Sequence, residues 1–558
     1  MTHTQTAAAP RDNADAVVIG AGFAGLYMLH RLRGMGLTAR GFEAASGVGG
    51  TWFWNAYPGA RCDVDSLEYS YSFDEALQQE WTWSERFAGQ PEIMRYLNHV
   101  VDRLDLRGMI ALSTRVLSAI WDDGAARWTV TTDKGDVVSA RFVITATGCL
   151  SMARAPDLPG LADFRGQTLH TGHWPHEGVD LRGKRVGVIG TGSSGIQAIP
   201  MIARDAAHVT VFQRTANFAI PARNTPTDPA REREWKAQYA AKRAAARETT
   251  AGILYDYNDT KALSVDANAR AAAYEDRWQT GGVNFMRTFC DLGLNRDANV
   301  TAADFVRAKI RETVQDPATA EALSPNDHPI GAKRICIDTD YFSTFNRPNV
   351  TLVNIRKAPI TGCDADGVIT EGGRHPLDIL VFATGFDAVT GALAAIDIRG
   401  VGGASLNDKW QDGPISQLGL ISAGFPNLFT VTGPGSPSIL TNVVVSIEQH
   451  VAWIADAIAH MQAIGARTMD ADPGAELAWM VKVGEAAGRT LFVEANSWYL
   501  GANIPGKPRV FLPYAGGFAA YRRICEQVAA DGYPGFVLRP DADADADADA
   551  AQAIPAQG

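Results

Sequence analysis

Residues 16–36 read AVVIGAGFAGLYMLHRLRGMG, which is an apolar strand, a glycine-rich turn and the start of a helix. In the turn, Gly20 permits the tight change of direction, Gly22 lets the backbone approach a pyrophosphate, and Gly25 lets the helix pack closely on the strand. The amino terminus of the helix adds N–H donors and a positive dipole. Glu43 ends the next apolar run, where a carboxylate can bind the hydroxyls of an adenosine ribose. The stretch therefore predicts a dinucleotide-binding unit of the Rossmann type.

A second stretch of the same form, RVGVIGTGSSGIQAIPMIA, spans residues 185–203. The apolar run that follows it has no acid at the position that corresponds to Glu43. Gln213, Arg214 and Thr215 stand there instead, and an arginine suits a 2′-phosphate because it forms charge-assisted hydrogen bonds. This favours NADPH over NADH, while a role for Arg214 as a solvated surface charge stays open. The turn itself consists of Gly190, Thr191, Gly192, Ser193, Ser194 and Gly195.

Two nucleotide units in one chain indicate a flavin, FAD, that takes a hydride from NADPH. A disulfide substrate would require a closely spaced cysteine pair, but the six cysteines are scattered without such a spacing. Oxygen is then the expected electron acceptor. The scattered cysteines also indicate a reduced, cytoplasmic protein, and they show no metal-site spacing, so no metal is predicted.

Composition and charge exclude several classes of protein. The 558 residues are 46% hydrophobic and 20% charged, which is typical of a globular chain with several domains. The net charge is −11 and no cluster of Lys and Arg is present, which argues against a nucleic-acid partner. The amino terminus lacks the pattern of a signal peptide, and no apolar run approaches the roughly 18 residues of a membrane span. We therefore expect neither secretion nor membrane insertion.

The remaining runs predict how the chain is organised. RFVITATG (141–148) and DILVFATGFD (378–387) are continuous and rich in β-branched residues, as buried parallel strands are. Residues 439–461 have apolar positions at helical spacing. We expect an α/β fold with two Rossmann-like dinucleotide-binding domains and a mainly helical insertion. The expected parts are an FAD-binding domain (15–150 and 387–539), an NADP-binding domain (151–224 and 330–386), the insertion (225–329) and disordered ends (1–14 and 540–558).

Between the two glycine turns, residues 164–175 read FRGQTLHTGHWP. This stretch resembles FxGxxxHxxxWP, the fingerprint of type I Baeyer–Villiger monooxygenases. The Trp-Pro ending separates it from the similar fingerprint of flavin-containing and N-hydroxylating monooxygenases. The chain resembles the family from about residue 15 to 538. Within the family it is most similar to the phenylacetone and steroid monooxygenase branch. Further stretches that carry the resemblance are 49–63, 333–350, 383–387 and 497–511.

The resemblance implies insertion of one oxygen atom from O2 beside a ketone carbonyl, through a C4a-peroxyflavin and a Criegee adduct, to give an ester or lactone. It implies that Arg334 is the permanent cation beside the reacting oxygen, with Asp63 as its carboxylate partner. Sulfide or amine oxygenation is the alternative within flavin enzymes, and an NADPH oxidase or a flavin redox sensor is the alternative outside them. The expected partners are the small-molecule ketone and O2, with the chain a monomer or a weak homo-oligomer.

The turns and the resemblance together also give the cofactor residues. For FAD they are Gly20, Gly22, Phe23, Gly25, Glu43, Gly50, Thr51, Trp52, Trp54, Asp63, Tyr69, Val116 and Val443. For NADP they are the six residues of the second turn with Arg61, Gln197, Arg214, Thr215, Lys333, Arg334 and Trp498. We expect Trp498 on a loop that covers NADP. His170 is open between a structural and a catalytic role. Ile330 stands where this branch has an aromatic residue, and we expect it near the cofactor cleft, where it bears on substrate shape.

Overall fold

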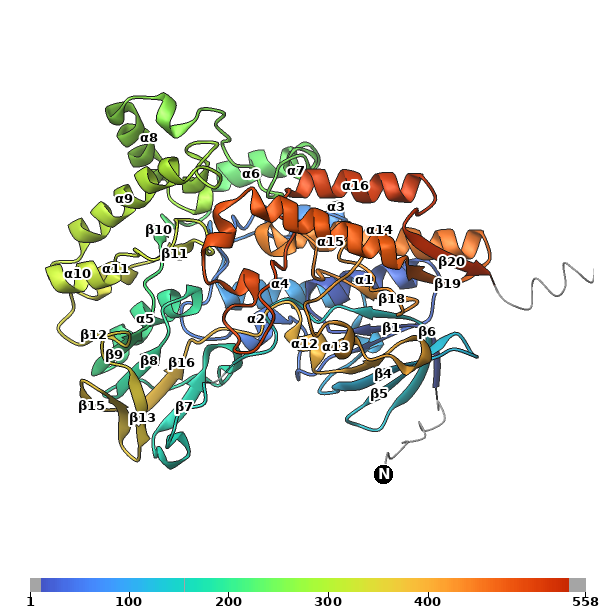
Figure 1. The fold of residues 1–558 in the computed structure, drawn as a ribbon, viewed down its shortest axis with the longest axis horizontal. Coiled ribbons are helices and arrows are strands. Elements are labelled where there is room, and N and C mark those ends of the chain that lie inside the picture. The colour runs from blue at the N-terminus through green and yellow to red at the C-terminus, as the bar shows by residue number, and fades with distance from the viewer. Residues whose placement is uncertain (1–11, 155, 541–558) are drawn as a thin grey trace, which may run out of the picture.

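The computed structural model describes residues 12–154 and 156–540 (Figure 1). Expectations for residues 1–11 and 541–558 concern parts of the chain outside these ranges. Two sheet-based units lie side by side in Figure 1. The first contains the first glycine turn and the second contains the second glycine turn, and a group of helices covers the second unit. The expected α/β fold, with two Rossmann-like units and substantial helical content, is confirmed.

The sheet of the first unit has the strand order β17-β4-β5-β6-β1-β2-β3, with β18 also paired to β6. Its centre is parallel, because β1 runs in the same direction as both β2 and β6. The carboxyl ends of β1 and β2 therefore bring Gly20 and Glu43 to one edge of the sheet. The strands are β1 (Asp12–Ile19), β2 (Ala39–Phe42), β3 (Ile110–Ala111), β4 (Val116–Asp122), β5 (Arg127–Thr132), β6 (Val137–Thr145), β17 (Asp397–Arg399) and β18 (Leu428–Thr430).

The first strand begins earlier than the composition suggests. Residues 12–14, expected to be disordered, form the start of β1 and pair with residues 138–140 of β6. Asp12 also forms an ion pair with Arg40. Pro540, expected to belong to the disordered tail, ends the last strand, where it pairs with Ala466. In both places the backbone pairs with a neighbouring strand, and Ala14 also packs in the core beneath the first sheet.

The long helix expected at 439–461 is present as α14, which begins at Val443 because the Asn442 side chain accepts a hydrogen bond from the N–H of Val444. It packs along α1, the helix that follows the first glycine turn. The helices of the first unit are α1 (Phe23–Gly34), α2 (Thr51–Trp54), α3 (Glu75–Glu80), α4 (Gln90–Arg103), α12 (Gly391–Ala394), α13 (Leu406–Lys409), α14 (Val443–Ala463), α15 (Pro473–Gly488) and α16 (Phe518–Ala530).

One fully buried histidine joins several segments of this unit. Nδ1 of His450 accepts from the Thr432 N–H at 3.0 Å, and Nε2 lies 3.0 Å from the Tyr521 hydroxyl. That hydroxyl donates to the carbonyl of Leu418, so Nε2 of His450 must carry the hydrogen. Burial lowers the pKa of His450 to about 3. The imidazole is therefore neutral in the folded protein, and a proton on Nδ1 would face the Thr432 N–H.

Because His450 is buried in its neutral form, we expect the stability of the folded protein to fall in acid. The folded pKa lies below the unfolded value, so the unfolded chain binds more protons between about pH 3 and 6.5, and stability falls as the pH drops through this window. At pH 5 the loss amounts to about 2 kcal/mol relative to pH 8. In urea unfolding, His450→Gln should show a smaller drop in midpoint between pH 8 and pH 5 than the wild type. An equal drop in the two proteins would contradict this role.

The second unit has an all-parallel sheet with the order β12-β9-β8-β16-β7. Both predicted parallel strands are confirmed. Residues 378–387 supply β16 of this sheet, and residues 141–148 supply part of β6 in the first sheet. The second glycine turn joins β8 to α5. The elements are β7 (Gln167–His170), β8 (Arg185–Ile189), β9 (His208–Gln213), β12 (Val350–Asn354), β16 (Ile379–Phe382), α5 (Ser193–Asp205) and α11 (Tyr341–Thr344).

The segment between β10 and β11 is largely helical. Four of its helices begin at a capping side chain, from Asp228, Asp266, Asn295 and Asp316. Its helices are α6 (Pro229–Ala237), α7 (Tyr239–Arg247), α8 (Ala267–Thr280), α9 (Arg296–Thr313) and α10 (Pro317–Leu323). The small sheets are β10 (Ala219–Pro221) with β11 (Cys336–Asp338), β13 (Ile360–Asp364) with β14 (Gly367–Thr370) and β15 (Gly373–Pro376), and β19 (Ala466–Ala471) with β20 (Phe536–Pro540).

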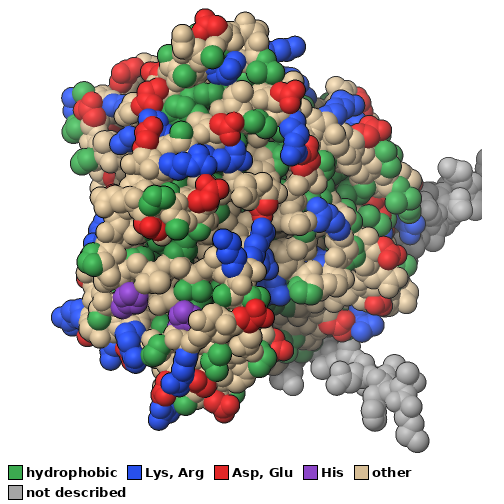
Figure 2. Space-filling model, turned by 60° about the vertical axis from the view of Figure 1, so that its left-hand side comes forward, with side chains coloured by type: hydrophobic (Ala, Val, Ile, Leu, Met, Phe, Trp, Pro, Cys, Tyr) green, Lys and Arg blue, Asp and Glu red, His purple; other side chains and the backbone are tan. Residues whose placement is uncertain are grey.

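The surface is mixed in charge. On the face shown in Figure 2, Lys and Arg side chains are interspersed with Asp and Glu side chains. None of the helices in the described ranges is both long and apolar enough to span a membrane.

Candidate functional site

A cleft of about 940 Å³ lies between the two units and is lined by residues of both glycine turns. The residues that the sequence predicts for the two cofactors line this cleft, with two exceptions, Gly25 and Gly195. Each of the two is the third glycine of its turn. The cleft also brings Asp63, Arg334 and Trp498 together with the turns, although they come from distant parts of the sequence.

The glycines of both turns divide into two kinds. A Cβ added to Gly192 would meet no described atom within 4 Å, and one added to Gly22 would lie no closer than 3.4 Å to its neighbours. A Cβ on Gly25 would lie 1.8 Å from the Gly20 carbonyl oxygen, and one on Gly195 would lie 2.3 Å from that of Gly190. The second glycine thus leaves space for a ligand, and the third permits helix and strand to touch. Both turns fit a dinucleotide pyrophosphate at a helix amino terminus.

Glu43 stands beside the first turn. Its carboxylate accepts from the N–H of Ala21 at 2.7 Å and from that of Ala45 at 2.8 Å. Burial raises the pKa of this carboxyl, while the backbone hydrogen bonds oppose the rise. The carboxylate therefore supports the turn and also faces the cleft, where ribose hydroxyls would reach it.

Arg334 and Asp63 form a two-fold ion pair in the cleft. Nε of Arg334 donates to Oδ2 of Asp63 at 2.6 Å, and Nη2 donates to Oδ1 at 2.7 Å. Nη1 donates to the Ile439 carbonyl at 3.1 Å, just before α14. The negative charge of Asp63 holds the pKa of Arg334 well above its usual value, although burial opposes this. The guanidinium is therefore a permanent cation with a fixed orientation.

A loop residue that the sequence reasoning missed completes this corner. Tyr499 is buried next to Trp498, and its hydroxyl lies near the Arg334 guanidinium. Burial raises the pKa of Tyr499 to about 12, so the hydroxyl stays protonated. Its position within the stretch 497–511 was the available signal, but nothing in the residue type indicates that it turns toward Arg334.

Three polar residues stand where NADP was expected to bind beyond the second turn. Arg214, Thr215 and Lys333 all line the cleft. The Thr215 carbonyl accepts from the Thr191 hydroxyl at 2.9 Å, which fixes this segment to the glycine turn. Burial lowers the pKa of Lys333, and the positive charge of Arg214 adds to the effect.

Aromatic side chains form another part of the cleft wall. Nε1 of Trp52 donates to the Tyr69 hydroxyl at 3.1 Å, so both rings are held in place. Trp54 meets the ring of His173 edge to face, with centroids 5.1 Å apart. Trp52, Trp54 and Tyr69, which the sequence assigns to FAD, all line the cleft.

Gln197 of α5 connects the two units. Its Nε2 donates to the carbonyl of Arg61 at 3.1 Å, and its Oε1 accepts from the Tyr57 hydroxyl at 2.8 Å. Gly59 permits this approach, because a Cβ there would lie 2.5 Å from the Gln197 carbonyl oxygen. Gln197 lines the cleft, but its amide is engaged with the first unit.

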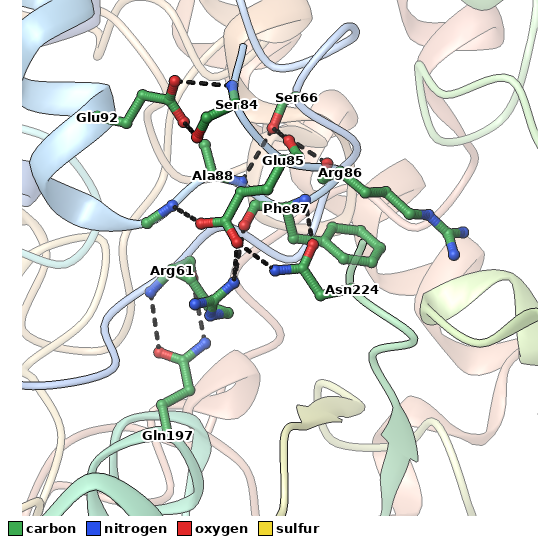
Figure 3. A network of polar contacts seen from close by, with 11 residues as sticks. Arg61, Ser66, Ser84, Glu85, Arg86, Phe87, Ala88, Glu92, Gln197 and Asn224 are labelled. Carbon is green, nitrogen blue, oxygen red and sulfur yellow. Dashed lines mark hydrogen bonds and ion pairs between the residues drawn. The ribbon is translucent and has the colours of Figure 1, made fainter. Parts of the chain in front are cut away.

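The Arg61 guanidinium points into a polar network beside the cleft (Figure 3). Nη1 of Arg61 donates to the Phe87 carbonyl at 3.0 Å and lies 3.3 Å from Oε2 of Glu85. The same carboxylate oxygen accepts from the Asn224 side chain at 2.6 Å. Asn224 belongs to the segment that leads from β10 into the helical insertion. The network therefore ties the Arg61 segment to that linker, a contact that no sequence motif announces.

The structure also places Ile330 and His170, the two residues whose bearing on the site was in question. Ile330 is 1% exposed, packs in the core of the second unit with the insertion, and is absent from the described cleft lining. The Asn299 side chain holds the N–H and the carbonyl of Ile330. Since Ile330 does not line the described cleft, it does not shape a substrate there by direct contact. His170 is also absent from that lining. Its Nδ1 accepts from the Gly172 N–H and its Nε2 lies 3.1 Å from the Arg154 carbonyl, an arrangement that supports the structural role.

No group of three or more described His, Cys, Asp and Glu side chains could hold a metal ion.

Comparison with known proteins identifies the family. Residues 17–237 match the family described as pyridine nucleotide-disulphide oxidoreductase. A Baeyer-Villiger monooxygenase of Pseudooceanicola batsensis is 43% identical, with 94% of this chain and 96% of that protein covered. A phenazine N-monooxygenase of Lysobacter antibioticus is 44% identical, with coverage of 94% and 97%. A solved structure of oxidized steroid monooxygenase bound to NADP is 52% identical, with a TM-score of 0.91 and coverage of 95% and 100%. The chain belongs to the Baeyer–Villiger monooxygenases.

Proposed function

We propose that this chain inserts one oxygen atom of O2 beside the carbonyl of a ketone and releases an ester or lactone, with FAD and NADPH as its cofactors. The observation that carries the proposal is the Arg334–Asp63 pair, which stands in one cleft with two glycine turns. The family assignment supports it, as does the relative's solved structure bound to NADP. When bound, FAD takes a hydride from NADPH and makes an oxygen atom of O2 available to the substrate.

Arg334 supplies the positive charge in this account. A guanidinium has five N–H donors, of which Asp63 takes two and the Ile439 carbonyl takes one. The remaining two can face the Tyr499 hydroxyl and an oxygen of the bound reactants. The fixed cation stabilises negative charge that develops on the substrate oxygen as the carbonyl carbon becomes tetrahedral. Because the donors are oriented before the reaction, no reorganisation is needed at that moment.

Asp63 holds the guanidinium in one orientation and does not remove its positive charge. Its two oxygens accept from Nε and Nη2, which prevents rotation of the guanidinium about the Arg334 side chain. The opposite charge of Asp63 also offsets the penalty of placing an arginine in a cleft that covers most of its side chain. Removal of either partner would leave the other charge without compensation.

The corner of Arg214, Thr215 and Lys333 is the part of the cleft that we assign to the 2′-phosphate of NADPH. Two cations and a hydroxyl suit a phosphate dianion, and no described acid stands at the position that Glu43 has in the first unit. The first turn instead has the Glu43 carboxylate, which accepts hydrogen bonds from free ribose hydroxyls. It therefore suits the adenosine half of FAD.

Product analysis tests the proposal. The FAD-loaded enzyme is given NADPH, O2 and a panel of cyclic, aryl-alkyl and steroid ketones, with a thioether and a tertiary amine in parallel, and hydrogen peroxide is quantified. Ester or lactone formation from at least one ketone is the expected result. Oxidation of the thioether or amine alone would favour heteroatom oxygenation, the reaction that the name of the phenazine relative indicates for that protein. Hydrogen peroxide as the sole product would favour an oxidase.

The cytoplasm is the compartment that we propose. All six cysteines are unpaired in the described structure, which fits a reducing environment.

A further inference from the structure

The carboxyl ends of β9 and β12 place two residues side by side behind the second nucleotide turn. These strands are parallel neighbours, with Gln213 paired to Asn354. The N–H of Ile355 continues the pairing by donating to the Gln213 carbonyl at 2.9 Å. Thr215 follows the first strand and Arg356 follows the second, so the sheet itself brings their side chains together.

The Arg356 guanidinium is clamped although about half of its side chain is exposed. Nη2 of Arg356 donates to the Thr215 hydroxyl oxygen at 3.0 Å and to Oδ2 of Asp327 at 2.6 Å. The other oxygen of Asp327 lies 2.6 Å from Nδ1 of His328, whose side chain is 1% exposed. Burial raises the pKa of Asp327, but the hydrogen bonds from His328 and Arg356 outweigh it and leave the pKa lowered. The carboxylate is therefore charged and its position is set by a buried neighbour.

The contact with Arg356 decides what the Thr215 hydroxyl can do. A hydroxyl has one hydrogen and two lone pairs, and the guanidinium can only donate. A lone pair of Thr215 is thus occupied, and its hydrogen remains for an acceptor. The Thr215 backbone is fixed as well, because its carbonyl accepts from Thr191 of the glycine turn. Since Thr215 lines the cleft with Arg214 and Lys333, the free hydrogen is available to an anion there.

We propose that Arg356 is a positioning residue for the 2′-phosphate of NADPH, which it serves through Thr215 while Asp327 holds it in place. The proposal rests on the assignment of this corner to the 2′-phosphate. Arg356 itself is absent from the described cleft lining, whereas its neighbour Ile355 is present. Arg356 therefore acts from behind the wall of the cleft, and its effect is confined to ligands that carry the phosphate.

Direct binding to the FAD-loaded enzyme tests the proposal without turnover. Calorimetry gives the Kd of 2′,5′-ADP, which carries the 2′-phosphate, and of 5′-AMP, which lacks it. Arg356→Met should weaken 2′,5′-ADP about tenfold and change 5′-AMP by less than about twofold. The matched control is Lys357→Met, which removes a positive charge from an exposed side chain one residue along the chain. This control should change neither ligand by more than about twofold.

A double-mutant cycle asks whether Arg356 acts through Thr215. In a Thr215→Val background, Arg356→Met should have less than about a twofold effect on 2′,5′-ADP, because the hydroxyl that it orients is gone. A full tenfold loss in that background would mean direct contact with the phosphate and would overturn the positioning role. Equal losses for Lys357→Met and Arg356→Met, equal losses for both ligands, or a wild type that does not prefer 2′,5′-ADP would also overturn it.

The outcome is separate from that of the ketone assay. Calorimetry measures the nucleotide subsite even if no ester is formed, so failure of the proposed oxygenation leaves this test intact. Conversely, ester formation with an unchanged Kd for 2′,5′-ADP in Arg356→Met would reject the positioning role alone. In steady-state assays, Arg356→Met should raise KM for NADPH about tenfold and leave KM for NADH and kcat unchanged.

Discussion

Arg334→Ala is expected to lower the rate of ester formation at least about a thousandfold. The substitution removes a permanent charge and the donors that remain after the bonds to Asp63 and Ile439 are made. Loss of one preorganised donor alone slows a reaction roughly hundredfold to thousandfold, and here a full charge is lost with it. NADPH oxidation should continue, because neither glycine turn is altered, and its electrons should appear as hydrogen peroxide. The measurement is ester and hydrogen peroxide formed per NADPH consumed.

The control for this prediction is Arg334→Lys, which keeps a positive charge but cannot form the two-fold pair with Asp63. We expect an intermediate rate of ester formation. The FAD content of both variants should match that of the wild type, which separates a chemical defect from a folding defect. Ester formation by Arg334→Ala at a rate close to that of the wild type would contradict the role of this residue.

Gly25→Ala should prevent the enzyme from retaining FAD. The added Cβ would lie 1.8 Å from the Gly20 carbonyl oxygen, so α1 and the turn must move apart. The turn also carries the N–H of Ala21, which donates a hydrogen bond to the Glu43 carboxylate. The displacement would break this hydrogen bond as well. We expect a loss of at least tenfold in bound FAD, together with a lower unfolding temperature.

Gly34→Ala is the matched control, because Gly34 lies in the same helix and a Cβ there would meet no described atom within 4 Å. It should bind FAD as the wild type does. The flavin absorbance of the purified proteins, scaled to protein concentration, gives the comparison. Equal flavin content in Gly25→Ala and the wild type would show that the turn tolerates a methyl group and would contradict the close-packing account.

Short sequence patterns predicted the turns, strands and helices whose geometry depends on residues close together in the chain. The two strand–turn–helix stretches specify their own geometry through glycines at fixed spacing, and the structure has both turns where they were expected. The helix from Val443 follows from apolar periodicity, and its start is set by the Asn442 cap. Continuous apolar runs likewise gave β6 and β16.

Contacts between distant segments were beyond the reach of such patterns. Arg334 and Asp63 are 271 residues apart, and only the family resemblance paired them in advance. Glu85 carries no motif, yet it joins the Arg61 segment to Asn224, because packing of the two units decides which loops meet. The resemblance likewise placed Ile330 near the cleft but did not reveal that its side chain packs in the core.

The isotope content of the ester formed under ¹⁸O2 tests the central claim most directly. The wild-type enzyme is supplied with NADPH and a ketone that it accepts, and the ester is analysed by mass spectrometry while hydrogen peroxide is quantified. The account predicts one ¹⁸O atom per ester, in the oxygen that bridges the carbonyl and alkyl carbons, with little hydrogen peroxide. An unlabelled ester, or NADPH consumption that yields hydrogen peroxide alone, would contradict it.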